Sequence, residues 1–310
     1  MMKYKLFVLQ VLAIAVLFNM TNICADGQIN EYIKAYEVQG LADFELEQDL
    51  VRESSCASLL SSLLPYAGDT SLIVRQKVYE LLYRKGVGES INNQSLIVDE
   101  LMSACMGKDI STGIRCMRYL QSFPVEAFNV SSRHKLEQLL EASKNPFFKE
   151  SVLLAGYLSI GKESLQRKLL LADDYTYQQI WYMHLALARM GIDKSLEHCI
   201  NTATRVDDGN DKVAYVLPDL IYTRQKKAID YCIEILNDDS NNCSSPDPDK
   251  DEMICCGYRV MELLAPIIDD FPYIVDDSGT LDSDDYSSAL TKCRAWFKGH
   301  PNYMIKTSMF

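Results

Sequence analysis

The chain has 310 residues, of which 48% are hydrophobic, and its formal net charge is −12 at pH 7. This length allows one sizeable core or several stacked repeats. The acidic balance argues against a nucleic-acid partner, because binding the phosphate backbone depends on clustered Lys and Arg side chains.

The first 25 residues are typical of a cleavable secretory signal peptide. Lys3 and Lys5 precede an apolar run over residues 6–18, and the polar stretch that follows ends in the small residue Ala25. A helix needs about 20 apolar residues to span a membrane, so this run is too short to be an anchor. We expect cleavage after Ala25 and a secreted or periplasmic mature chain without a membrane span. Its net charge would be −14, because two lysines leave with the leader (−12 minus 2).

After the leader, apolar residues recur every three or four positions, which is the period of an amphipathic helix. One example is the series Val74, Val78 and Leu82, followed by Gly86, a residue type that often ends helices. Alternating strand patterns and hairpin turns are rare. The sequence therefore predicts an all-α protein that begins with a helical cap over residues 26–68.

Two segments in the second half of the chain repeat the same order of residue types. Leu-Glu-His-Cys-Ile at 196–200 is matched 33 residues later by Ile-Asp-Tyr-Cys-Ile at 229–233. Upstream, Ala155-Gly156 corresponds to Leu185-Ala186 at a spacing of 30 residues. Self-similarity at about 30 to 35 residues, with two helices in each unit, predicts a helical solenoid.

These units resemble HEAT repeats, in particular the short HEAT-like form of phycobilisome lyases. The resemblance rests on residues of two units: Val74, Arg75, Val78, Leu82 and Gly86, and Met183, Leu187, Gly191, Asp193 and Leu196. It implies a right-handed α-solenoid of about six HEAT-like helix pairs with helical caps. The units are expected to begin near Thr70, Ser111, Pro146, Tyr175, Asn210 and Glu252. Pro218 is expected to kink the first helix of its unit or to shift that helix boundary.

The expected layout has four parts: signal peptide (1–25), N-terminal helical cap (26–68), HEAT-like repeats (69–270), and an acidic loop with a C-terminal capping helix (271–310). Residues 237–285 hold fourteen Asp or Glu against Lys250 and Arg259, a net charge of −12. Ser283 is the expected N-cap of a last helix that runs from about Asp284 to Lys298.

The chain has ten cysteines, of which nine stay after the leader is removed. An odd number leaves at least one thiol unpaired or intermolecular. The candidates for a disulfide that fastens the acidic loop are Cys243 with Cys255 or Cys256. Cys105 with Cys116 is a second candidate pair. Connectivity does not follow from sequence, so these alternatives stay open.

Two acidic loops raise the question of calcium, since hard cations prefer carboxylate oxygens. One runs from Asp238 to Asp251 and the other from Asp276 to Asp285. Neither follows the ligand order of an EF-hand, so a solvated loop is the simpler interpretation. A calcium-stabilised secreted module is nevertheless one alternative function.

The densest aromatic cluster lies near residue 180. Tyr177, Trp181 and His184 fall on one face of the helix expected there. One interpretation is core packing, because aromatic side chains dominate cores. The other is that this face lines a concave groove, in which case these residues would be the anchors of a partner-binding site.

Catalytic motifs are missing from the sequence, including His-Glu-x-x-His, Gly-x-Ser-x-Gly, a phosphate-binding Gly loop and Cys-x-x-Cys. We therefore predict no catalytic, metal-binding or cofactor-binding residues. The expected function is that of a non-catalytic exported scaffold that binds another protein or a peptide. The resemblance implies an alternative, a lyase-like or other enzyme on a HEAT-like solenoid, which needs a reactive Cys, His or acid cluster in a pocket. The sequence does not identify the partner, the host organism or the oligomeric state.

Overall fold

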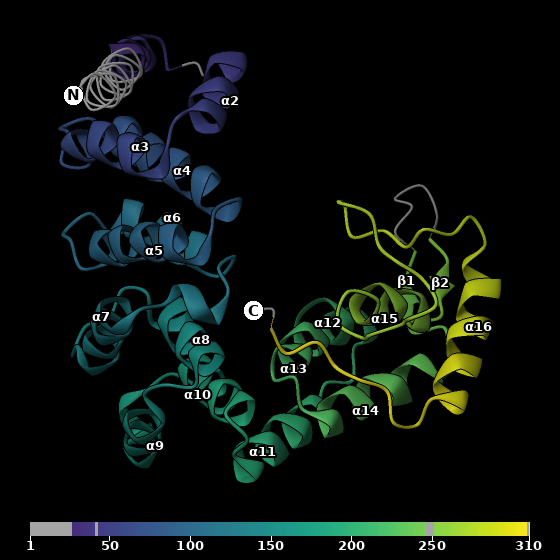
Figure 1. The fold of residues 1–310 in the computed structure, drawn as a ribbon. Coiled ribbons are helices and arrows are strands. Elements are labelled where there is room, and N and C mark those ends of the chain that lie inside the picture. Colours follow the sequence, from purple (N-terminus) through teal and green to yellow (C-terminus); the bar gives the residue numbers. More distant parts are fainter. Residues whose placement is uncertain (1–26, 41–42, 246–250, 309) are drawn as a thin grey trace, which may run out of the picture. The chain divides into compact units, whose positions relative to one another are not determined.

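The computed structural model describes residues 27–310 except 41–42, 246–250 and 309. The expected signal peptide therefore lies outside the described residues. The described chain is mostly helical, which confirms the all-α prediction (Figure 1). Its strands are two short segments, β1 (Cys243–Ser244) and β2 (Met253–Ile254), paired antiparallel. No helix in the described parts combines the length and apolarity needed to cross a bilayer.

The chain divides into two compact units, residues 1–135 and 136–310. The described part of the first unit begins with a helix over residues 27–39. It continues with α2 (Phe44–Glu53), α3 (Cys56–Leu63), η1 (Leu64–Tyr66), α4 (Leu72–Val87), α5 (Ile91–Cys105), α6 (Ile110–Leu120), η2 (Val125–Ala127) and the start of α7 (Val130–Glu141). α4 packs against α3, α5 and α6, and the Arg75 side chain on α4 binds Asp109, the N-cap of α6, at 2.8 Å.

A buried ionic cluster joins the first helices of this unit. Glu47 on α2 is only 2% exposed, and its carboxylate binds Lys77 at 2.9 Å and Arg84 at 2.6 Å. The Tyr32 hydroxyl, from the helix over residues 27–39, also donates to Glu47. Burial by itself would raise the pKa of Glu47, but the hydrogen bonds and the two cations lower it. The cluster therefore contains an ionised carboxylate with its partners in place.

The second unit contains the end of α7 and nine further α-helices with two short non-α turns among the described residues. These are α8 (Phe148–Leu158), α9 (Lys162–Leu170), η3 (Ala172–Asp174), α10 (Tyr177–Arg189), α11 (Asp193–Ala203), α12 (Gly209–Asp211), η4 (Lys212–Val216), α13 (Leu217–Tyr222), α14 (Lys226–Leu236), α15 (Gly257–Leu264) and α16 (Tyr286–Gly299). α10 packs against α8, α11 and α13, and α14 packs against α11, α13 and α15. The core of the second unit includes the fully buried residues Leu154, Met183 and Leu220.

Each expected unit start lies close to the start of a helix. α4, α6, α8, α10, α12 and α15 each begin within about five residues of the positions expected from the repeat pattern. The repeated segments 196–200 and 229–233 both lie on helices, α11 and α14, which contact each other. Cys199 and Cys232, at equivalent positions of these helices, are both buried free thiols.

Pro218 interrupts the helix in which it lies. Residues 212–216 form a π-helix, in which the Leu217 N–H donates to the Lys212 carbonyl. Proline has no N–H to donate to the preceding turn and its ring clashes there, so the helix widens before it and restarts as α13. The kink expected at Pro218 is therefore a π-helical turn that ends two residues before it, at Val216.

Two expected helix ends differ from the structure. The N-cap of α16 is Asp285, whose carboxylate accepts from the Ser288 N–H at 3.0 Å, so Ser283 is not the cap. Gly86 does not end α4 but lies inside it, where a Cβ would stand 2.9 Å from the Phe123 ring. Gly191 follows α10 with φ +82°, a conformation that favours glycine.

Candidate functional site

The three predicted partner-binding residues lie along α10 with different exposure. Tyr177, in the first turn, is 70% exposed, whereas Trp181 and His184 are half-buried. The core-forming face of the same helix is made by other side chains, including Met183 and Leu187. Tyr177 is therefore a surface residue, and the two other side chains lie at the border between surface and core.

Trp181 is fixed by a carboxylate from another helix. Its indole N–H donates to Asp219 Oδ2 on α13 at 2.6 Å. Burial raises the pKa of Asp219, although the bond from Trp181 and the charge of Lys149 act in the opposite direction. A half-buried indole with its only donor satisfied has a defined orientation, so Trp181 offers a rigid aromatic edge.

Lys149 and Tyr182 complete the polar surroundings. The Lys149 ammonium lies 4.9 Å from the centre of the Tyr182 ring, a cation–π distance. The Tyr182 hydroxyl accepts from Gln178 at 3.0 Å. α8 and α10 therefore place one exposed cation beside the half-buried carboxyl of Asp219.

Two histidines stack at the far end of the cluster. The rings of His184 and His198 lie 3.9 Å apart at an interplanar angle of 20°. Burial, and secondarily the charge of His198, lowers the pKa of His184 to about 4. Burial also lowers the pKa of His198, with a smaller effect from Arg205. Stacking of two cations at this distance would be repulsive, so at most one of the two imidazoles is protonated.

His184 also faces a hydroxyl, since its Nδ1 lies 3.2 Å from Ser195 Oγ. A serine beside a histidine is the geometry of a nucleophile and its base. The Ser195 side chain is only 3% exposed, however, and a histidine with a pKa near 4 is a weak base at neutral pH. The contact is better explained as satisfaction of a buried hydroxyl.

α10 and α13 run in the same direction. Trp181 bonds to Asp219, and further along both helices Arg189 Nη1 donates to the Tyr222 carbonyl at 2.6 Å. The first turn of α10 and the turn η4 before α13 each carry an exposed tyrosine, Tyr177 (70%) and Tyr215 (69%). We call the following residues the α10 face: Tyr177, Trp181, His184, His198, Tyr215 and Asp219.

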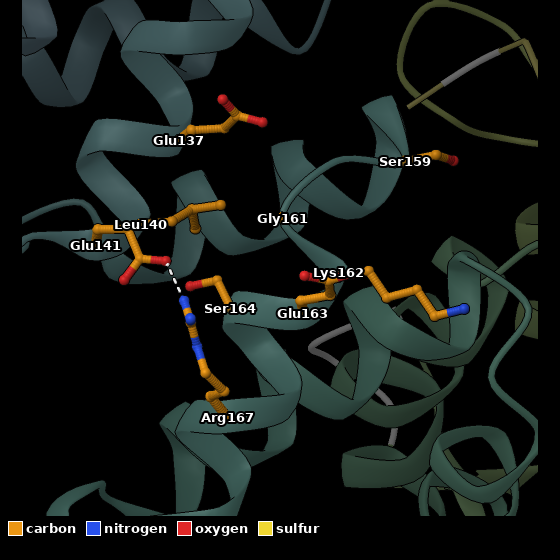
Figure 2. Close-up of a pocket in the computed structure, with 9 residues that line it drawn as sticks. All are labelled: Glu137, Leu140, Glu141, Ser159, Gly161, Lys162, Glu163, Ser164 and Arg167. Atoms are coloured by element: carbon orange, nitrogen blue, oxygen red, sulfur yellow. Dashed lines mark hydrogen bonds and ion pairs between the residues drawn. The ribbon is translucent and has the colours of Figure 1, made fainter.

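A separate cleft of about 510 Å³ lies between α7 and α9 in the second unit (Figure 2). It is lined by charged and small residues, and Glu141 binds Arg167 across it at 2.8 Å. Figure 2 shows the Lys162 side chain directed away from this pair. Both partners of the pair are more than half exposed, so the attraction is screened by water. The cleft is a solvated ionic surface without a converging set of catalytic groups.

The cysteine candidates have distinct states. Cys243 and Cys256 form a disulfide, and it joins β1 to the start of α15. Cys255, the alternative partner, is a buried free thiol whose Sγ donates to the Asp238 carbonyl at 3.1 Å. Cys105 and Cys116 are also free and buried, so the structure does not pair them. Burial raises the pKa of the Cys105 thiol to about 12, which makes a thiolate rare at neutral pH.

Within the acidic loops, Asp276 serves as a turn cap. Asp276 Oδ1 accepts from the backbone N–H groups of Ser278 at 2.8 Å and Thr280 at 3.0 Å. Across the described ranges, no group of three or more His, Cys, Asp or Glu side chains is placed to hold a metal ion.

Asp219 and Tyr215 are members of the α10 face that the sequence pattern did not single out. Asp219 is 38 residues from Trp181, so no local motif connects them. One signal was present, because the repeat aligns the helix of Trp181 with that of Asp219. A polar residue such as Asp219, in the helix that aligns with the helix of Trp181, could have indicated the pair.

Comparisons with protein-family models, curated proteins and solved structures found no match. The interpretation of the α10 face therefore rests on its own geometry. It combines exposed aromatic rings, a fixed indole and a pair of stacked imidazoles, which is a surface suited to binding.

Proposed function

We propose that this chain is a non-catalytic exported binding protein, built as a solenoid of HEAT-like helix pairs, whose α10 face docks a protein or a peptide. The export part of the proposal rests on the first 25 residues of the sequence. The binding part rests on the exposed aromatic side chains and on the fixed orientation of Trp181.

The spacing of contacts supports the solenoid within each unit. In the first unit, Arg75 binds Asp109 at a separation of 34 residues, and the Tyr83 ring stacks on Tyr119 at 4.4 Å. In the second, the Trp181 and Asp219 pair has a separation of 38 residues. Contacts at nearly one repeat length, between helices of equivalent position, are what a stack of similar units produces.

The observation that carries the binding proposal is the exposure of Tyr177 beside a fixed Trp181. Tyrosine and tryptophan supply large contact areas at a low cost in side-chain entropy. Trp181 is already oriented by Asp219, so little ordering would be needed when a partner binds. Tyr177 and Tyr215 are both largely exposed to solvent, where a partner can reach them.

A peptide-display experiment tests this proposal. The chain from Asp26 onward would be used to select binders from a random peptide library. The affinities of the selected peptides would then be measured for Tyr177→Ala and Trp181→Ala. Loss of an aromatic anchor costs about 2 kcal/mol or more, so affinity is expected to fall at least about tenfold.

The control is Phe44→Ala, which removes an aromatic side chain of similar exposure (63%) in the first unit. Its affinity for the selected peptides should equal that of the parent chain. Fluorescence gives an independent readout, since the chain has two tryptophans and Trp296→Phe leaves Trp181 as the only one. Peptides that bind without perturbing Trp181 emission and without sensitivity to Tyr177 would refute the proposed face.

A further inference from the structure

The last described residues of the chain return to the middle of the second unit. Beyond α16, Figure 1 shows the yellow segment running back past α14 to end near α13. Along this path the Asp269 N–H donates to the Met304 carbonyl at 3.0 Å and the Lys306 N–H donates to the Ile267 carbonyl at 2.9 Å. The Tyr303 hydroxyl donates to Asp230 on α14 at 2.7 Å. Backbone and side-chain bonds therefore hold this segment in an extended conformation.

Four side chains receive the end of the segment, namely Tyr157, Arg189, Tyr222 and Arg224, which we call the Tyr–Arg cluster. The Phe310 ring lies 5.6 Å from the ring of Tyr157 and 5.5 Å from that of Tyr222, measured between centroids. Arg224 Nη2 donates to the Phe310 oxygen at 3.1 Å. The Tyr157 hydroxyl donates to the Ser308 carbonyl at 3.0 Å. Ring contacts and polar contacts thus act on the same short stretch of peptide.

The cluster residues also make contacts that do not involve the segment. Tyr157 and Tyr222 are 6% and 8% exposed, and the Tyr222 hydroxyl is anchored on the Leu153 carbonyl at 2.5 Å. The Arg189 guanidinium lies 4.7 Å from the Tyr222 ring and 5.0 Å from the Tyr157 ring. Arg224 has φ +55°, a strained conformation for an arginine, and its Nε is buried without a hydrogen-bond partner. Strain and an unsatisfied donor of this kind are concentrated at binding sites.

The electrostatics of the cluster favour an oxygen acceptor. Burial lowers the pKa of Arg224 to about 10, with a further contribution from the nearby Arg189 cation. Two guanidinium groups that repel each other in a partly desolvated place are stabilised by a carbonyl or carboxylate oxygen. The segment supplies such an oxygen at Phe310.

We propose that the Tyr–Arg cluster is a peptide-binding site for an aromatic residue that presents a carbonyl or carboxylate oxygen, and that Phe310 occupies it as an intramolecular ligand. A peptide of the same chemistry would compete with the chain's own segment for the site. This inference goes beyond the α10 face, because none of the four cluster residues belongs to that face.

The test uses a synthetic peptide of residues 303–310 as the probe and the full chain carrying Phe310→Ala as the receptor. Removing the ring leaves its place between Tyr157 and Tyr222 open and weakens the intramolecular competitor, whose effective concentration is about millimolar for a short tether. The probe is therefore expected to bind the Phe310→Ala chain at least about tenfold more tightly than the parent chain. A probe with Ala in place of its Phe should lose at least about tenfold in affinity for this receptor.

Two further variants keep the result independent of folding and of the α10 face. Arg224→Asn, added to Phe310→Ala, removes the guanidinium. Asparagine tolerates the positive φ of this position, so the backbone should be kept. This double variant should not bind the probe. Tyr177→Ala, added to Phe310→Ala, should leave probe binding unchanged even if it abolishes binding at the α10 face. Equal probe affinity in the parent and Phe310→Ala chains, or probe binding that survives Arg224→Asn, would overturn the proposal.

Discussion

Gly156 on α8 and Ala186 on α10 touch through their backbones, since a Cβ added to Gly156 would stand 2.8 Å from the Cα of Ala186. The two residues are 30 positions apart in the sequence (186 minus 156), and the repeat pattern predicts them to be equivalent. The side chain of Tyr222 covers the same glycine. A small residue is therefore required here because two helices approach closely and not because of backbone conformation.

Gly156→Ala should destabilise the second unit. Alanine gains about 0.5–1 kcal/mol over glycine inside a helix. Overpacking against backbone atoms costs about 1–3 kcal/mol, and it should prevail because Ala186 Cα cannot move aside alone. Urea unfolding would measure the change. Gly299→Ala is the matched control, since nothing lies within 4 Å of the Cβ that it adds at the end of α16. An unchanged or raised unfolding midpoint for Gly156→Ala would contradict the close approach.

Glu47→Gln should destabilise the first unit by about 3–5 kcal/mol, because it leaves the charges of Lys77 and Arg84 without their shared buried carboxylate. Thermal unfolding followed by circular dichroism would measure this loss. Glu53→Gln removes the same charge from an exposed ion pair on α2, and its effect should stay below about 1 kcal/mol. Similar losses for the two variants would show that the buried Glu47 cluster contributes no more to stability than an exposed ion pair.

Stability of the second unit should fall as the pH falls from about 7 toward 4. The pKa of His184 is lowered from 6.5 to about 4 in the folded chain, so between these values the unfolded chain binds more protons. Unfolding is then favoured by acid, and the contribution of His184 is full above the unfolded pKa and is lost on acidification. His184→Gln should flatten this part of the stability curve. The exposed His300→Gln should leave the slope unchanged, and an identical slope in all three chains would count against the buried neutral imidazole.

The Cys243 and Cys256 disulfide should be found by peptide mapping under non-reducing conditions, with Cys255 alkylated only after unfolding because it is buried. The bond closes a loop with a sequence separation of 13. Replacing both cysteines by serine is expected to cost about 3 kcal/mol of stability in the loop-entropy description. Cys232→Ser, which removes a buried free thiol, provides a comparison without loss of a bond. A linked Cys243 and Cys255 peptide would contradict the assigned pairing.

The sequence predicted the helices well because their signals are local. Apolar spacing of three and four residues placed helix starts near Thr70, Ser111 and Pro146 before any tertiary contact was known. The exact helix ends were less certain. Gly86 was expected to end α4, and the helix ends one residue later, at Val87.

The sequence by itself determined that this protein is mostly helical, that two similar segments recur 33 residues apart, and that its densest aromatic cluster lies near Trp181. Periodicity and composition are properties of neighbours in the chain, so they can be read without coordinates. The tertiary structure alone decided which aromatic side chains are exposed, that Trp181 bonds to Asp219, and that Phe310 reaches Arg224. Those relationships join residues 38 and 86 positions apart, and their free energy depends on burial and orientation, which a linear pattern does not specify.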